Sequence, residues 1–128
     1  AAPGTRPSVL VEWWPKPVIA AARQSWVNDL ITRAGGRNPW DVLDARSVPQ
    51  DHAEAAAMQP DVVVMSWCGV REENYRAGLV RKRPGWEHVP AVARDRIHAV
   101  SEAFLGRPGP RLVEGYRRLR EAIAAAAA

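Results

Sequence analysis

The hydrophobic positions of this chain form short continuous runs separated by longer, periodic stretches. The clearest run is residues 61–67 (DVVVMSW), whose consecutive apolar residues without alternation indicate a strand covered on both faces. Residues 8–13 (SVLVEW) form a similar run, and residues 96–101 (RIHAVS) a shorter one. We expect the first strand to stop at Pro15 and Pro17, because proline has no N–H group for a sheet ladder.

Helical periodicity separates these runs. Residues 25–36 (SWVNDLITRAGG) place apolar side chains on one face and end in two glycines. Residues 51–61 start with Asp51 at a helix N-cap position and Glu54 at capping-box spacing, and Pro60 closes this short helix.

Two further helices are predicted in the second half of the chain. Residues 71–86 look helical as far as Pro84, and residues 108–123 carry an apolar stripe with Pro110 in a tolerated first-turn position. Strands that alternate with helices predict a three-layer αβα lobe with a short, mainly parallel sheet.

The domain boundaries follow from the same pattern. We expect the lobe to span residues 8–123, with residues 1–7 as a linker remnant and the alanine-rich residues 124–128 as a helix end or tail. No stretch is long enough to cross a bilayer, and the first residues lack the pattern of a signal peptide.

Charge and cysteine content narrow the function classes. The net charge of +4 comes mostly from arginines that are dispersed, and no basic run interleaves with aromatic residues as a nucleic-acid platform requires. We therefore expect no nucleic-acid partner. The single cysteine, Cys68, excludes an internal disulfide and a zinc site built on several thiolates.

Large aromatic residues follow the predicted strands at the point where each strand ends. In a parallel sheet, ligands bind in the crevice beyond the carboxyl ends of the strands. The residues expected there are Glu12, Trp13 and Trp14 after the first strand, Ser66, Trp67 and Cys68 after the second, and Ser101, Glu102 and Phe104 after the third. An aromatic rim of this kind suits a bulky, flat ligand, because aromatic faces give a large contact area at low entropic cost.

Catalytic chemistry has weaker support. The glycine-rich fingerprints of dinucleotide and phosphate binding are missing. Cys68 is a candidate nucleophile with His52 or His98 as its base, or else a small residue packed under a loop. A small flavodoxin-like enzyme or regulatory domain that uses Glu12 and Cys68 therefore remains an alternative. The histidines His52, His88 and His98 show no metal-ligand spacing.

Several motifs occur together in one order along nearly the whole chain. They are the strand that ends in EWWPKP, the helix SWVNDLITRAGG followed by Asn38, the strand PDVVV, the segment PGWEHVPAV, and the helix start RPGPRLVEG. In this order they resemble the carboxyl-terminal lobe of the periplasmic substrate-binding proteins that serve ABC importers for cobalamin, siderophore-bound iron and haem. The resemblance is greatest to the cobalamin-binding branch.

This resemblance implies a two-lobed binding protein, not an enzyme. Its ligand lies in the cleft between the lobes and is delivered to a membrane permease, so we expect a periplasmic or cell-surface location. An amino-terminal lobe is absent from these residues, and the exposed cleft edge is a surface for association. Cobalamin is the expected ligand, with haem and a ferric siderophore as alternatives, and no cofactor is expected.

The resemblance also implies site residues. The expected cleft residues are Trp13, Trp14, Pro17, Arg46, Ser47, Phe104 and Arg107, and this chain adds Trp67. Ile19 is a further candidate. Of the two adjacent tryptophans, we expect Trp13 to pack inward and Trp14 to face the ligand. Arg107 is either a partner for an anionic ligand group or a solvated loop residue, and Glu54 is the candidate for docking to the permease in addition to its capping role.

Overall fold

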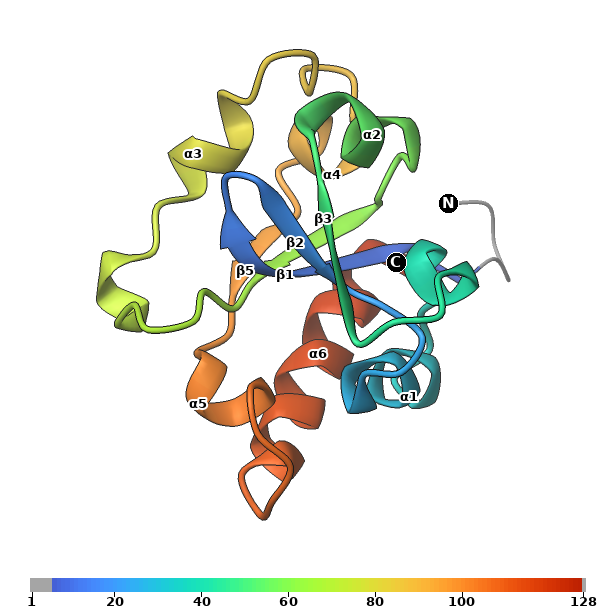
Figure 1. The fold of residues 1–128 in the computed structure, drawn as a ribbon, viewed down its shortest axis with the longest axis vertical. Helices are drawn as coiled ribbons and strands as arrows, with labels where there is room; N and C mark the ends of the chain where they lie inside the picture. Colours follow the sequence, from blue (N-terminus) through green and yellow to red (C-terminus); the bar gives the residue numbers. More distant parts are fainter. Residues whose placement is uncertain (1–5, 128) are drawn as a thin grey trace.

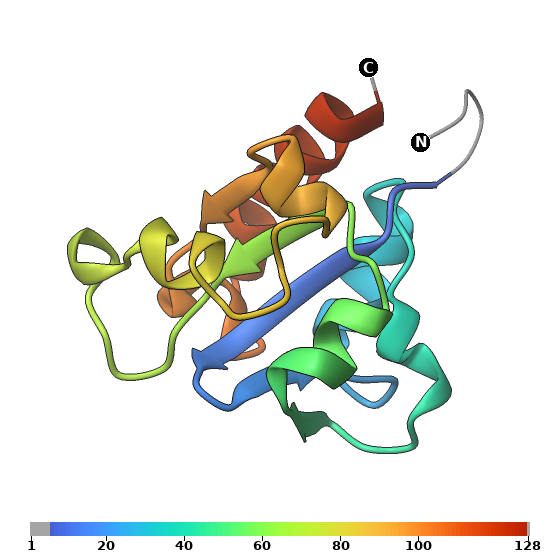
Figure 2. The same ribbon diagram turned by 90° about the horizontal axis from the view of Figure 1, so that it is seen from above.

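A five-stranded mixed sheet forms the centre of the computed structural model, which describes residues 6–127 (Figure 1). The strands are β1 (Val9–Pro15), β2 (Val18–Ala21), β3 (Ser47–Gln50), β4 (Val62–Met65) and β5 (Ile97–Ala99), in the order β3-β2-β1-β4-β5. Figure 2 shows β1 and β4 side by side and pointing the same way, and β5 continues this parallel half. The strands β2 and β3 form an antiparallel half. The α/β fold class is therefore confirmed, with a sheet that is mixed rather than mainly parallel.

The β1–β2 hairpin confirms that the first strand ends at the prolines and adds a second strand that the sequence did not predict. The ladder continues to Pro15, which pairs with Val18, and Lys16 and Pro17 form the turn. A proline at the last strand position or in the turn removes no hydrogen bond that the ladder needs. The sequence "VIAA" that follows is thus a strand, not part of the loop before the next helix.

Three of the predicted helices are present as α1, α2 and α6, whereas the one predicted over residues 71–86 is not continuous. They are α1 (Trp26–Arg33), η1 (Pro39–Val42), α2 (His52–Ala57), η2 (Glu72–Asn74), α3 (Ala77–Arg81), α4 (Pro90–Ala93), α5 (Glu102–Leu105) and α6 (Leu112–Ala127). The predicted capping box of α2 is confirmed: the N–H of Glu54 donates to Asp51 Oδ1 at 2.7 Å, and the N–H of Asp51 donates to Glu54 Oε1 at 3.0 Å.

The expected helix over residues 71–86 breaks into η2, α3 and loop. Tyr75 turns out of the helical path and is buried against Trp67, with 5.2 Å between ring centroids. The helix α6 reaches Ala127, so it includes most of the predicted tail. The predicted linker remnant falls mainly on residues 1–5, which lie outside the described residues.

Two hydrophobic clusters lie on opposite faces of the sheet. Because neighbouring strand residues point to opposite faces, Leu10 and Val63 join one cluster with α2, α3 and α4, while Val11 and Val64 join the other with α1 and α6. Figure 1 shows these layers, with α2, α3 and α4 above the sheet and α1, α5 and α6 below it. The strands β1 and β4 are thus covered on both faces, as predicted for β4. In residues 6–127, no helix has the length and apolarity to cross a membrane.

Candidate functional site

A hollow of about 390 Å³ opens beside the carboxyl end of β1. We call it the aromatic hollow. It is lined by Trp13, Trp14, Ile19, Ser25, Trp26, Arg46, Ser47, Cys68 and Gly106. The structure thus brings together the predicted cleft residues Trp13, Trp14, Arg46 and Ser47 and the further candidate Ile19, although they come from three separate segments of the chain.

A break in strand register explains how two neighbouring tryptophans reach the same hollow. Glu12 pairs with Ala20, whereas Trp14 pairs with Ile19, so the register shifts by one residue around Trp13. Such a bulge interrupts the alternation of side chains between the two faces of a sheet. Trp13 is partly buried and packs against the hydrophobic cluster that contains α1 and α6, whereas Trp14 is 42% exposed. Both rings nevertheless line the hollow.

Trp26 is a site residue that the sequence reasoning assigned only to the apolar face of a helix. It occupies the first position of α1, and its indole Nε1 donates to the carbonyl oxygen of Leu105 at 2.8 Å. This hydrogen bond fixes the ring between α1 and the end of α5. The sequence feature that could have identified Trp26 is its position at the start of a helix, where a large ring with a polar N–H can reach the surface.

Trp67 lies in the core rather than on the rim, which corrects the expectation that it reaches the cleft. Only 3% of the residue is exposed, and its indole Nε1 donates to Glu12 Oε2 at 2.9 Å. The indole N–H of Trp67 therefore has a hydrogen-bond acceptor inside the lobe, which holds the ring in the core.

Three other predicted cleft residues lie outside the aromatic hollow. Phe104 is partly buried beneath the guanidinium of Arg118, which lies 4.6 Å from the ring centroid. Arg107 is exposed and lines a separate hollow in the loop before α6. Pro17 borders another hollow together with His52.

Glu12 is a buried ion-pair partner. It has no exposed surface, and its Oε2 accepts a hydrogen bond from Arg83 Nη2 at 2.7 Å. The same Nη2 atom also donates to the carbonyl oxygen of Pro15 at 3.3 Å. Glu12 and Arg83 thereby hold the end of β1, which carries Trp13 and Trp14, against the loop after α3.

Residues 4–103 match the family of periplasmic binding proteins. The chain belongs to this family. It is 29% identical over 118 residues to an uncharacterised ABC transporter substrate-binding lipoprotein, YvrC, of Bacillus subtilis, covering 91% of this chain and 35% of YvrC. The expectation of a binding-protein lobe is confirmed at the level of the family, and the relatives are named as binding proteins rather than enzymes.

Solved binding proteins have the same fold. The haem-binding protein RhuT from Roseiflexus sp. RS-1 superposes with a TM-score of 0.80 at 29% identity, over 98% of this chain and 48% of RhuT. The vitamin B12-binding protein BtuF of Vibrio cholerae gives a TM-score of 0.76 over 95% of this chain and 46% of BtuF, and at 18% identity it supports the fold alone. The chain thus spans less than half the length of these family members.

Cys68 lies at the hollow of this binding-protein lobe without the partners of a catalytic nucleophile. Burial and the negative charge of Glu102 raise the pKa of its thiol, which disfavours the reactive thiolate. No histidine hydrogen-bonds to its sulfur in the part of the chain that the structure describes, and burial lowers the pKa of His98. The nucleophile and base that the enzyme alternative requires are not brought together. Within residues 6–127, no cluster of three His, Cys, Asp or Glu side chains is placed to hold a metal.

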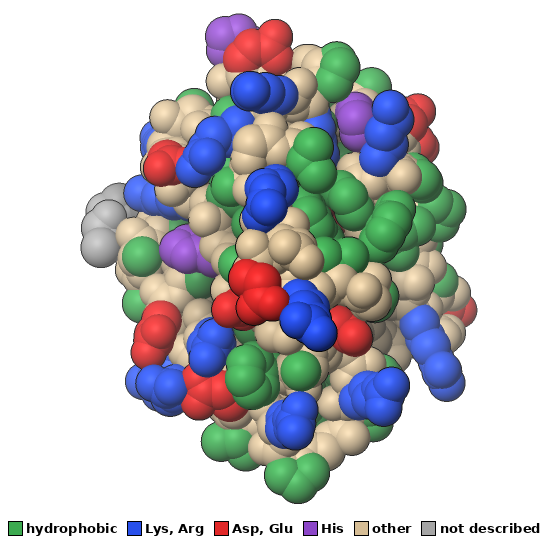
Figure 3. Space-filling model, turned by 90° about the vertical axis from the view of Figure 1, so that its left-hand side faces the viewer, with side chains coloured by type: hydrophobic (Ala, Val, Ile, Leu, Met, Phe, Trp, Pro, Cys, Tyr) green, Lys and Arg blue, Asp and Glu red, His purple; other side chains and the backbone are tan. Residues whose placement is uncertain are grey.

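The side of the lobe toward which β1 and β4 point is partly apolar. Figure 3 faces this side and shows hydrophobic side chains gathered over its upper right part, with lysine and arginine side chains among them. Trp14, near the end of β1, and Leu79, in α3, are large hydrophobic residues that are exposed, at 42% and 54%. A binding-protein lobe therefore presents an apolar surface near the ends of its strands.

Proposed function

We propose that this chain is the carboxyl-terminal lobe of a solute-binding protein for an ABC importer, and that the aromatic hollow is one wall of its ligand cleft. The complete protein would capture a bulky metal chelate in the periplasm or at the cell surface and deliver it to a membrane permease. Membership of the family and coverage of less than half of its relatives support this assignment. An amino-terminal lobe would supply the other wall.

The observation that carries the proposal is the grouping of three indole rings in one hollow. Trp13, Trp14 and Trp26 come from the end of β1 and the start of α1, and they line a space whose surface is largely apolar. Flat aromatic side chains offer contact area at low rotamer cost, so they fit a large, rigid macrocycle. A small polar solute would leave these rings without contacts.

Cobalamin is the first candidate ligand. Its cobalt carries ring nitrogens and its own axial group, so the protein has to supply contact area rather than a metal ligand, and the indole rings supply it. Haem is the second candidate, because iron in proteins takes axial His, Cys, Met or Tyr ligands and Cys68 lines the hollow. A ferric siderophore is the third, since Arg46 would face its anionic oxygens.

Titration of the full-length protein with cyanocobalamin, haem or ferrichrome tests this proposal, with tryptophan fluorescence as the readout. We expect saturable quenching by one of the three ligands. The substitution Trp14→Ala should weaken that binding by about 1–3 kcal/mol, the scale of losing a buried aromatic contact. Val113→Ala is the matched control, because Val113 is 75% exposed and lies on α6, outside the hollow. No response to any ligand, or equal losses in both variants, would contradict the proposal.

We further propose that Glu54 contacts the permease. Its side chain is exposed at the start of α2, where one carboxylate oxygen serves the capping box. Glutamine can fill this capping position as well, so Glu54→Gln removes the charge and keeps the helix start. Uptake by the reconstituted importer should fall while the free energy of unfolding stays the same. Unchanged uptake would exclude Glu54 as a docking residue.

A further inference from the structure

A second hollow, of about 530 Å³, is bordered by the tip of the same β1–β2 hairpin. Its lining combines Pro15, Leu79 and Pro84 with four cationic residues, namely Lys16, Arg76, Lys82 and Arg83. None of its lining residues is an aspartate or glutamate. We call this second hollow the cationic groove.

Most of the positive charge in the groove is uncompensated. Among residues 6–127, Lys16, Arg76 and Lys82 form no salt bridge, and Arg76 Nη1 donates to the backbone carbonyls of Glu73 and Tyr75 at 3.0 and 3.2 Å. An adjoining hollow that shares Lys16 with the groove is also lined by Asp51, whose Oδ1 atom already accepts the N–H of Glu54. A concave surface with one sign of charge concentrates the electrostatic field and attracts ions of the opposite sign.

Arg83 gives the groove a buried donor. Only 4% of this residue is exposed, and its Nη2 atom is engaged by Glu12 and Pro15. Its Nε and Nη1 atoms have no hydrogen-bond partner in the described part of the chain. Buried N–H groups without acceptors are costly, and a guanidinium donates most strongly to carboxylate and phosphate oxygens.

The walls of the groove are held in place by core contacts. The guanidinium of Arg83 lies 4.6 Å from the ring centroid of Trp86, which is fully buried. The indole Nε1 of Trp86 in turn donates to the carbonyl oxygen of His52 at 2.8 Å. The side chains of Arg83 and Trp86 thus connect the hairpin tip, the start of α2 and the loop after α3, so the guanidinium of Arg83 is fixed before any ligand arrives.

We propose that the cationic groove binds an oxyanion, the carboxylate or phosphate group of a small molecule. Lys16, Arg76 and Lys82 would contact its oxygens, Arg83, whose charge is paired with Glu12, would hold the wall of the groove in place, and Pro15, Leu79 and Pro84 would contact its carbon atoms. The oxyanion comes either from a substituent of the chelate in the aromatic hollow or from a free anion. The chemistry of recognition is the same for both sources and does not depend on the proposed transport function.

Calorimetric titration of the full-length protein with pyrophosphate tests the site. We expect saturable binding that Arg76→Gln/Lys82→Gln weakens at least about tenfold, because the variant loses two cationic donors to the oxygens of the anion. The control Arg33→Gln/Arg120→Gln removes the same charge from exposed positions on α1 and α6 and should change affinity less than about twofold. Absence of saturable binding, or equal weakening by the control, would overturn the proposal.

A second set of titrations separates the two sources of the oxyanion. If the chelate supplies it, Arg76→Gln/Lys82→Gln weakens the binding of haem and leaves that of haem dimethyl ester, which lacks free carboxylates, unchanged. If the anion is free, the double substitution affects pyrophosphate alone. Both results support the site. Trp14→Ala should leave pyrophosphate binding unchanged, so failure of chelate binding and failure of the cationic groove are measured independently.

Discussion

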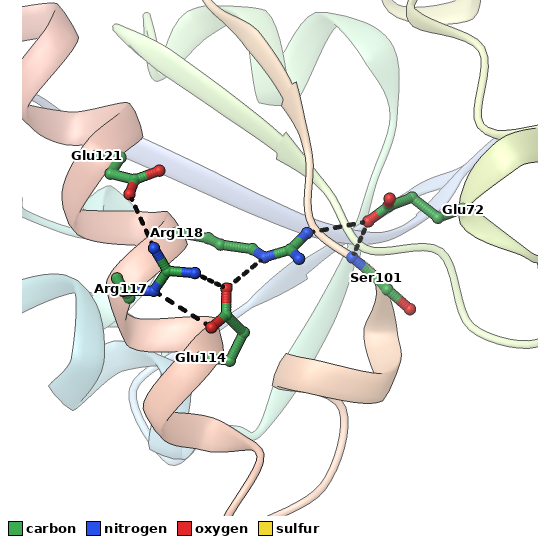
Figure 4. Close-up of polar contacts among 6 residues, drawn as sticks. All are labelled: Glu72, Ser101, Glu114, Arg117, Arg118 and Glu121. Atoms are coloured by element: carbon green, nitrogen blue, oxygen red, sulfur yellow. Dashed lines mark hydrogen bonds and ion pairs between the residues drawn. The ribbon is translucent and has the colours of Figure 1, made fainter.

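Two groups of paired charges in this lobe differ in their access to water. The Glu12–Arg83 pair lies beneath the carboxyl end of β1, with side chains 0% and 2% exposed. A second group lies on α6 and the loops beside it (Figure 4). There Glu114 Oε2 accepts from Arg117 Nη2 at 2.6 Å and from Arg118 Nε at 2.8 Å, and 63% of the Arg117 side chain is exposed.

This second group extends across three segments. Arg117 Nη1 lies 3.4 Å from a Glu121 carboxylate oxygen, and Arg118 Nη1 lies 3.7 Å from Glu72 Oε1. Glu72 Oε1 also accepts the backbone N–H of Ser101 at 2.9 Å, which connects η2 to the start of α5 (Figure 4). The second group contains more contacts than the buried Glu12–Arg83 pair, but water can replace each of these contacts.

The comparison shows that burial, rather than the number of ion pairs, determines how much a charge constrains the fold. An exposed ion pair exchanges protein contacts for water at little cost, whereas a buried charge that loses its partner has no replacement. The buried pair therefore fixes the segment that carries Trp13 and Trp14. The exposed ion pairs on α6 can exchange for contacts with water, so they constrain the fold less.

The largest effect is expected from separating the buried pair. Arg83→Met leaves the carboxylate of Glu12 buried without a counter-charge, which should lower the free energy of unfolding by about 3–5 kcal/mol in urea titrations. Glu12→Gln/Arg83→Met removes both charges and should be more stable than the single variant. A loss below about 1 kcal/mol in the single variant would contradict the assigned role of the pair.

A smaller effect is expected from the packing of α6 itself. A Cβ atom at Gly115 would collide with the carbonyl oxygen of Phe104 and lie 2.7 Å from Leu105 Cδ2, so Gly115→Ala should destabilise the lobe by about 1–3 kcal/mol. Gly78→Ala in α3 is the matched control, because no atom lies within 4 Å of its added Cβ and helix propensity favours alanine. Equal urea midpoints for the two variants would show that close packing does not anchor α6.

The smallest effect is expected from the exposed charges, and it should depend on pH. Hydrogen bonds and charges from Arg117 and Arg118 lower the pKa of Glu114, so its ionised form stabilises the fold above the unfolded pKa of about 4.3. This contribution is lost as the pH falls through the lower folded pKa. Glu114→Gln should therefore slightly lower the urea midpoint at about pH 7 and match the unaltered protein near about pH 2. A difference that grows toward acid pH would have the wrong sign.

The sequence predicted the elements whose signals are local. The continuous apolar run at residues 61–67 indicated a strand covered on both faces, and Asp51 with Glu54 predicted the start of α2; both are confirmed. The strands β2 and β3 were missed because they are short and lie beside prolines, so antiparallel pairing with β1 and not their own pattern defines them.

The candidate site was predicted where it depends on strand ends and missed where it depends on distant partners. Trp13 and Trp14 follow directly from the end of β1. Trp67 has the same sequence signal, but its ring is buried because Glu12, 55 residues away, accepts its N–H. The partner of Glu12 is Arg83, 71 residues away, and no spacing rule connects two residues at that separation.

The two edge strands of the sheet bear on how this lobe behaves at high concentration. The edge strand β3 has four residues and includes Pro49, which has no N–H group to offer, and the opposite edge strand β5 has three residues. Short edges that contain proline are poor templates for adding a strand from another molecule. Neither edge thus favours growth into fibrils, so the lobe can keep an apolar face open without strand-mediated aggregation.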